Sequence, residues 1–235
     1  ARCTIACRAC SPRRDRSARI LTQSTSHYPT TPTMSRFLIT VLAVLAAYLL
    51  GSVPFAVVAS RLFGLADPRS YGSKNPGATN VLRSGHKGAA ICTLVGDVAK
   101  GWLAVFLAAR YAAFLGDDTV GLVALAVFCG HLYPVFLGFK GGKGVATAAG
   151  VLLAIDLRLG LATLGTWLLV AFTLRYSSLA ALIAAVGAPI YALLLWGRNP
   201  LVLAVGVIAI LLIGKHWPNL QRLMAGSEPR IGAGK

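Results

Sequence analysis

The first polar residues that could do chemistry lie in residues 66–88, ADPRSYGSKNPGATNVLRSGHKG. Ser73, Asn75, Thr79, Asn80 and Arg83 place hydroxyl, amide and guanidinium groups among glycines and prolines. Glycine and proline favour defined turns, and glycine lets the backbone approach a ligand closely. This density of hydrogen-bonding groups indicates an anion-binding site rather than a generic solvated loop.

A second candidate site surrounds Lys143, which lies among Gly141, Gly142 and Gly144 just before an apolar segment. Backbone N–H groups at the start of a helix, together with a lysine, can bind phosphate. The pattern is not a nucleotide-binding P-loop, because Leu137 stands where the first glycine is required and Gly144 where serine or threonine is required. A structural alternative is a glycine-rich helix start whose lysine only reaches toward water.

A third group lies near the end of the chain, in GKHWPNLQRLMAGSEPRIG. His216 and Asn219 are three residues apart and would share one face of a helical turn. Glu228, an isolated acid among basic residues, fits an ion-pair partner better than a catalytic base. The hydroxyl of Ser178, in the segment RYSS, is predicted to lie at the same end of the protein.

Charged and titratable residues also occur inside apolar segments. Asp97 and Lys100 are three residues apart in such a segment, and His131 lies near the end of another. Charges within a membrane segment are costly and are usually paired or functional. For Asp97 and Lys100 both readings stay open, and His131 could serve in a site or only in packing.

Several reaction types are absent from the sequence patterns. No paired carboxylates suggest acid–base catalysis, no Cys/His cluster has metal-ligand spacing, and no G-x-S-x-G elbow occurs. No histidine is followed five residues later by aspartate, the signature of common membrane acyltransferases. A cationic, glycine-lined pocket for phosphorylated ligands remains, with chemistry that rests on positioning and electrostatic stabilisation.

The elements that must position these groups are membrane helices. Of the 235 residues 56% are hydrophobic and only 13% charged, the mean hydropathy is +0.70, and the formal net charge is +16. The apolar content excludes a disordered basic protein, and long uncharged runs argue against a nucleic-acid partner. We therefore expect an all-α polytopic membrane protein with about seven transmembrane helices. The segments are roughly 36–58, 89–113, 119–138, 144–157, 159–175, 178–196 and 200–214.

Basic residues are unequally divided between the two faces that these spans define. One face carries the polar loops with Arg61, Arg69, Lys74, Arg83, Lys87, Lys140, Lys143, Arg175, Lys215, Arg222, Arg230 and Lys235. The other carries Arg36, Arg110, Arg158 and Arg198. The positive-inside rule makes the first face cytoplasmic.

The Arg-rich segment 1–33 would then lie outside, against this rule. We predict that 1–33 is a disordered extension and that the functional protein, one membrane domain over 34–235, begins near Met34.

The strings GSVPFA, DPRSYGSKNPGATNVLR, GHLYPVFLGFKGGKGVAT, RYSS and HWPNLQRLMAGSE occur in one order over nearly all of the chain from Met34. Together they resemble the bacterial acyl-phosphate:glycerol-3-phosphate acyltransferase family (PlsY). The resemblance implies a seven-helix enzyme of the bacterial inner membrane. Its substrates would be acyl phosphate and glycerol 3-phosphate, its product lysophosphatidic acid, and its environment membrane lipid. We expect a monomer without metal or cofactor.

Site residues follow from the resemblance by position. Ser73 and Arg83 match the essential serine and arginine of the first motif. The glycerol-phosphate loop is matched by Gly141, Gly142, Lys143 and Gly144. His216 and Asn219 match the active residues of the third motif, and Glu228 matches its structural acid. Ser73, Arg83, His216 and Asn219 are the predicted catalytic residues, and Asn75, Thr79, Asn80 and Ser178 join the glycine loop in substrate binding. The family usually has glycine where this chain has Lys74. The alternative function is a transporter or binding protein for an organic phosphate.

Overall fold

The computed structural model describes residues 33–232, and every regular element within this range is helical. The helices are α1 Thr33–Ser52, α2 Phe55–Leu62, α3 Ala78–Leu82, α4 Lys87–Arg110, α5 Ala112–Leu115, α6 Asp117–Leu132, the 3₁₀ helix η2 Val135–Leu137, α7 Val145–Ile155, α8 Leu157–Leu174, α9 Ser177–Trp196, α10 Pro200–Lys215 and α11 Trp217–Met224. The all-α prediction is confirmed. The predicted extension, residues 1–33, lies outside the described residues except for Thr33.

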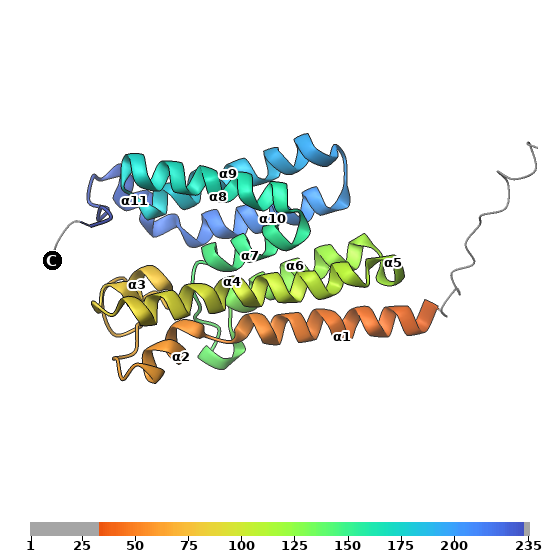
Figure 1. The fold of residues 1–235 in the computed structure, drawn as a ribbon, viewed down its shortest axis with the longest axis horizontal. Coiled ribbons are helices and arrows are strands. Elements are labelled where there is room, and N and C mark those ends of the chain that lie inside the picture. Colours follow the sequence, from red (N-terminus) through yellow and green to blue (C-terminus); the bar gives the residue numbers. More distant parts are fainter. Residues whose placement is uncertain (1–32, 233–235) are drawn as a thin grey trace, which may run out of the picture.

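Five helices are long and apolar enough to cross a membrane, and α10 with α11 forms a sixth candidate span bent by 57°. The helix α7 has 11 residues, about 16 Å of helix, which is shorter than a bilayer core of about 30 Å. It occupies the predicted segment 144–157. Figure 1 shows these helices side by side, with α4, α6 and α7 in the middle of the bundle.

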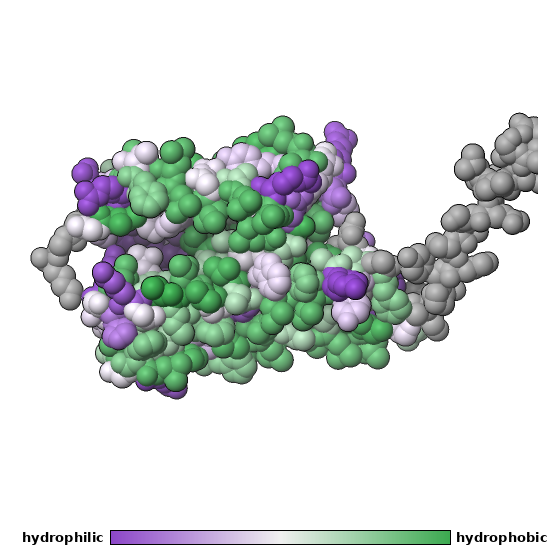
Figure 2. Space-filling model, viewed as in Figure 1, coloured by the Kyte–Doolittle hydropathy of each residue, from purple (hydrophilic) through white to green (hydrophobic). Residues whose placement is uncertain are grey.

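The predicted span 36–58 is divided into two helices. Proline has no N–H group and restricts the residue before it, so Val53 and Pro54 end α1 at Ser52 and the chain turns into α2. The helices α2, α3 and α11 lie at one end of the bundle, on the left in Figure 1. Figure 2 shows hydrophobic colours along the helices and a hydrophilic recess at that same end.

Close helix packing fixes this end of the bundle. Side chains at Gly51 and Gly130 would overlap the facing backbone across the α1–α6 contact, and a side chain at Gly150 would overlap the carbonyl of Val98 across the α4–α7 contact. Small residues allow membrane helices to approach in this way. The loop after α1, the loop after α6 and the loop before α7 are therefore joined to firmly packed helices.

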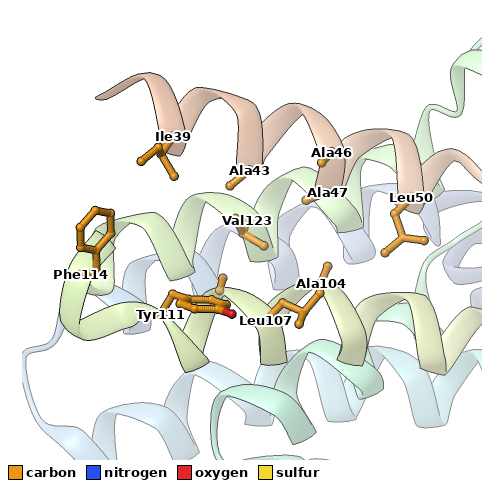
Figure 3. Close-up of a pocket in the computed structure, with 11 residues that line it drawn as sticks. Ile39, Ala43, Ala46, Ala47, Leu50, Ala104, Leu107, Tyr111, Phe114 and Val123 are labelled. Carbon is orange, nitrogen blue, oxygen red and sulfur yellow. The ribbon is translucent and has the colours of Figure 1, made fainter. Parts of the chain in front are cut away.

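A groove of about 400 Å³ lies between α1, α4 and α6. Figure 3 shows Ile39, Ala43 and Leu50 of α1 facing Leu107 of α4 and Val123 of α6 across it. Its lining is almost wholly apolar. Apart from the Tyr111 hydroxyl, its lining side chains are apolar and none can bind phosphate by charge, so the candidate active site lies elsewhere.

Candidate active site at one end of the helical bundle

A chain of hydrogen bonds joins the glycine loop to the C-terminal segment. The ammonium of Lys143, in the loop before α7, donates to the side-chain carbonyl of Asn219 on α11. The amide of Asn219 donates to Oε1 of Glu228 at 2.6 Å, and Arg222 Nε donates to Oε2 of the same carboxylate at 2.7 Å. Two of the three predicted polar segments therefore meet in one site.

His216 stands at the bend between α10 and α11 and is only 3% exposed. Its ring Nδ1 lies 2.9 Å from the backbone oxygen of Leu212. Because a carbonyl oxygen can only accept, Nδ1 must carry the proton of this hydrogen bond. In the neutral ring Nε2 then keeps its lone pair, so His216 can accept a hydrogen bond from a ligand hydroxyl.

The site holds more positive than negative charge. Burial lowers the pKa of Lys143 to about 8; the Glu228 carboxylate opposes this shift, and the charges of Arg222 and Arg83 add to it. Arg83 comes from the first polar loop, so the charge of that loop also acts on Lys143. The Glu228 carboxylate is bonded to Arg222 and linked through Asn219 to Lys143, so two cations share one carboxylate, an arrangement that favours an anionic ligand.

Glu228 has a strongly hydrogen-bonded environment. Burial raises the pKa of its carboxyl, but the neighbouring side chains of Ser178, Asn219 and Arg222 outweigh burial and lower it below the usual value. Ser178 lies in the first turn of α9 and is buried. Its hydroxyl acts on the pKa of the predicted structural acid but forms no hydrogen bond within the described residues. Its contact with substrate stays a prediction.

Asn80 holds the first polar loop together. Its side-chain oxygen accepts from the Ser73 N–H at 2.9 Å, and its amide donates to the backbone oxygens of Pro68 at 2.6 Å and Tyr71 at 3.2 Å. The side chain is 2% exposed. Asn80 thus folds the loop that presents Ser73, a role that the sequence pattern did not reveal.

The same loop presents several predicted ligand-binding groups to solvent. Ser73, Thr79 and Arg83 are exposed, and Asn75 is half-buried. Lys74 has φ +55°, in the left-handed region that favours glycine. The glycine that the family resemblance leads us to expect at this position would adopt this conformation without strain, whereas lysine adopts it at a cost.

The glycine loop is packed tightly on the end of α6. The N–H of Gly142 donates to the backbone oxygen of His131 at 3.1 Å. Side chains at Gly141 and Gly142 would overlap His131, and one at Gly144, where φ is +84°, would overlap Phe128. The helix α7 begins with no side-chain cap, so its first N–H groups are left for water or a ligand.

Arg222 is a site residue that the motif analysis missed. The charge pattern identifies it only as a basic residue of one face, although it lies three positions after Asn219 and therefore on the same side of α11. Helical spacing was the available signal.

Hydrogen bonds also hold the last described residues against the start of α9. The N–H of Ile231 donates to the backbone oxygen of Arg175 at 2.6 Å, and Arg175 Nη2 donates to the backbone oxygen of Ile231 at 2.8 Å.

Comparison with known proteins identifies the family. The profile of the family described as glycerol-3-phosphate acyltransferase matches residues 41–226. Proteins with that name from Dechloromonas aromatica and Ralstonia nicotianae are 64% and 61% identical over 194 and 204 residues. The matches cover 83% and 86% of this chain and 97% and 99% of those proteins.

Two solved structures have the same fold. Both are crystal structures of PlsY, an integral membrane glycerol 3-phosphate acyltransferase, one in its glycerol 3-phosphate form and one in its lysophosphatidic acid form. Their TM-scores are 0.78 and 0.77 at 37% and 36% sequence identity, and the matches cover 83% of this chain and 96% of each solved chain. The family profile spans more than half of the chain, and it covers every site residue named above except Glu228: the chain belongs to the glycerol-3-phosphate acyltransferase family.

Proposed function

We propose that this enzyme transfers an acyl group from an acyl phosphate to the 1-hydroxyl of glycerol 3-phosphate, forming lysophosphatidic acid and inorganic phosphate in phospholipid synthesis. The observation that carries the proposal is the hydrogen-bonded chain from Lys143 through Asn219 to Glu228 and Arg222 at the end of a membrane helix bundle, with the charge of Arg83 acting on Lys143 from the first polar loop. Such a site suits two phosphorylated substrates, one of which has an apolar chain that can stay in the bilayer.

The cations have the role of holding phosphate. Arg83 suits bidentate contact with phosphate oxygens, and Lys143 acts as a point charge. The free N–H groups at the start of α7 add donors for the same anion. Ser73 and Asn75 orient the substrates from the first loop, and Thr79 lies beside them on α3. Glu228 holds Asn219 and Arg222 in place and takes no part in the chemistry.

The reaction needs one new bond and one broken bond. The 1-hydroxyl oxygen attacks the acyl carbonyl carbon and forms the ester bond. The bond between that carbon and the phosphate oxygen breaks, and inorganic phosphate leaves with the bonding electrons. Nε2 of His216 accepts the hydrogen bond of the attacking hydroxyl and orients it, and the proton passes to a phosphate oxygen of the substrates. The nearby cations stabilise the negative charge that develops on the leaving phosphate.

The location follows from topology. We propose a monomer in the bacterial inner membrane with the site at its cytoplasmic face. The basic polar loops at the site end support this orientation by the positive-inside rule. A cytoplasmic site also gives direct access to a soluble substrate such as glycerol 3-phosphate.

The decisive experiment combines purified protein, an acyl phosphate and labelled glycerol 3-phosphate, with the lipid product resolved from the aqueous substrate. We expect labelled lysophosphatidic acid from the parent and none from Arg83→Ala. Arg158→Ala, which removes an arginine at the other end of the bundle, is the matched control and should retain turnover. No lipid product, together with uptake of label into protein-containing vesicles, would establish the transporter alternative instead.

A further inference from the structure

A cluster of three buried ionisable side chains lies beneath the site. Asp97 and Lys100 on α4 are each 3% exposed, and His131 in the last turn of α6 is 7% exposed. Lys100 Nζ lies 2.9 Å and His131 Nδ1 lies 3.4 Å from the same oxygen of Asp97. Charges inside a membrane protein are costly, and those that occur are paired and usually serve a function.

The cluster contacts the segments that carry the site. Lys100 Nζ donates at 2.9 Å to the backbone oxygen of Val53, at the break between α1 and α2. The backbone oxygen of His131 accepts from the Gly142 N–H, and the His131 ring fills the space that a side chain at Gly142 would need. The glycine loop therefore packs directly against His131.

A water-sized cavity of about 10 Å³ connects these parts. Its lining includes the three members of the cluster, Gly141 and Gly142 of the glycine loop, and Pro76 of the first polar loop. The cluster and both loops that carry the predicted phosphate-binding groups thus face one small cavity. Lys143 follows immediately after Gly142. A shift of His131 would therefore move the backbone of Gly142 and, with it, the lysine whose ammonium contacts Asn219.

We propose that Asp97 is a positioning residue for glycerol 3-phosphate binding. Its carboxylate fixes the orientation of the His131 ring and holds Lys100 against Val53. The ring and the carbonyl of His131 then fix the Gly141–Gly142 backbone. The electrostatic attraction between Nδ1 and this carboxylate oxygen favours one direction of the ring, whereas apolar packing alone would allow it to rotate. This inference rests on the proposed function, because its main readout is affinity for glycerol 3-phosphate.

The competing explanation is that the cluster only stabilises the packing of α4 against α6 and α1. In that case a substitution would lower the amount of folded enzyme and its unfolding temperature. The KM of the enzyme that remains folded would stay the same, since KM does not depend on enzyme concentration. KM for glycerol 3-phosphate therefore separates the two roles.

The test uses Asp97→Asn in the full-length protein, with Asp156→Asn as matched control. Asp156 also pairs with a basic residue, at 2.8 Å, but it lies between α7 and α8 at the other end of the bundle. We expect Asp97→Asn to raise KM for glycerol 3-phosphate about tenfold, since small displacements of positioning groups have effects of this size or larger. The control should keep the KM of the parent. A KM for Asp97→Asn within twofold of the parent overturns the proposal.

A second variant covers failure of Asp97→Asn to fold. The double variant Asp97→Asn/Lys100→Gln removes both opposite charges, so neither is left buried without a partner. We expect it to fold and still to show the raised KM, because the carboxylate that orients His131 is absent. A double variant with the KM of the parent also overturns the proposal.

Hydrogen–deuterium exchange gives a readout that does not depend on the proposed function. Loss of the Asp97 carboxylate should speed exchange of the amides in residues 141–147, and Asp156→Asn should leave them unchanged. If the parent makes no lysophosphatidic acid, the proposed function fails while the exchange result still decides whether Asp97 positions the loop. Unchanged exchange in a folded Asp97 variant overturns the positioning role.

Discussion

The ammonium of Lys143 donates a hydrogen bond to the side chain of Asn219, which lies 76 residues later in the chain. This contact joins the glycine loop to α11 and brings the lysine beside Glu228 and Arg222. It also takes the lysine out of bulk water, and its pKa falls accordingly. The charge that is proposed to hold phosphate is therefore sensitive to pH near neutrality.

The activity should decline in mildly alkaline solution. Burial lowers the pKa of Lys143 to about 8, so in the free enzyme the ammonium is charged below pH 8 and becomes neutral as the pH rises through that value. We expect kcat/KM for glycerol 3-phosphate, which reports groups of the free enzyme, to fall above about pH 8. Steady-state kinetics from pH 6 to pH 9.5 measure this. Lys143→Arg, which stays charged, should lack the alkaline decline; an unchanged decline would assign it to another group.

Glu228 should control the same pH profile. Its negative charge raises the pKa of Lys143, so Glu228→Gln should move the alkaline decline to lower pH. The substitution also removes the acceptor that orients Asn219 and Arg222, so kcat/KM at pH 7 should fall about tenfold or more. The pH profile of the variant measures both effects. An alkaline limb at the parent position would show that Glu228 does not act on Lys143.

Much of the site could be predicted from local patterns. Gly141, Gly142 and Lys143 stand before an apolar helix, and His216 and Asn219 share a helical face, so spacing alone makes both groups candidates, while their proposed roles come from the family resemblance. The all-helical membrane fold followed from long uncharged segments. These features depend on residues close together in the chain, where periodicity and composition carry the information.

Other features depend on tertiary contacts that spacing does not encode. The pattern predicted one helix over 36–58, but Pro54 divides it. Asn80 looked like a ligand-binding amide, and the structure shows that its side chain holds the loop backbone. The role of His131 needs the loop from Gly141 to Gly144 to fold back onto α6. No sequence interval between these residues indicates such a contact.

Lys74→Gly should stabilise the enzyme. Lys74 has φ +55°, a conformation that costs a non-glycine residue roughly 1–2 kcal/mol, and glycine adopts it without strain. The greater entropy of glycine in the unfolded chain offsets part of this gain. We expect a small rise in the unfolding temperature in detergent. Lys140→Gly, at an exposed loop lysine without positive φ, is the control and should bring no rise. Equal shifts in both variants would exclude backbone strain as the cause.

Gly142→Ala should weaken glycerol 3-phosphate binding. The added methyl group would overlap the His131 ring, so the loop must move and carry Lys143 with it. We expect KM for glycerol 3-phosphate to rise about tenfold or more, with a smaller change in KM for acyl phosphate. Gly165→Ala is the control, because a side chain at Gly165 on α8 meets no neighbouring atom within 4 Å. An unchanged KM in Gly142→Ala would remove the loop from the glycerol 3-phosphate site.

His216→Gln distinguishes the two possible roles of the imidazole. Nδ1 donates to the backbone oxygen of Leu212, and Nε2 has the lone pair that faces a ligand hydroxyl in the proposed mechanism. Glutamine can accept a hydrogen bond through its side-chain oxygen but cannot take a proton near neutral pH. If His216 only orients the hydroxyl, the variant should keep turnover within about tenfold of the parent, whereas loss of a general base costs about 100-fold to 10,000-fold. Single-turnover rates with saturating substrates measure the step. A loss in the larger range would assign proton acceptance to His216 instead of a substrate phosphate.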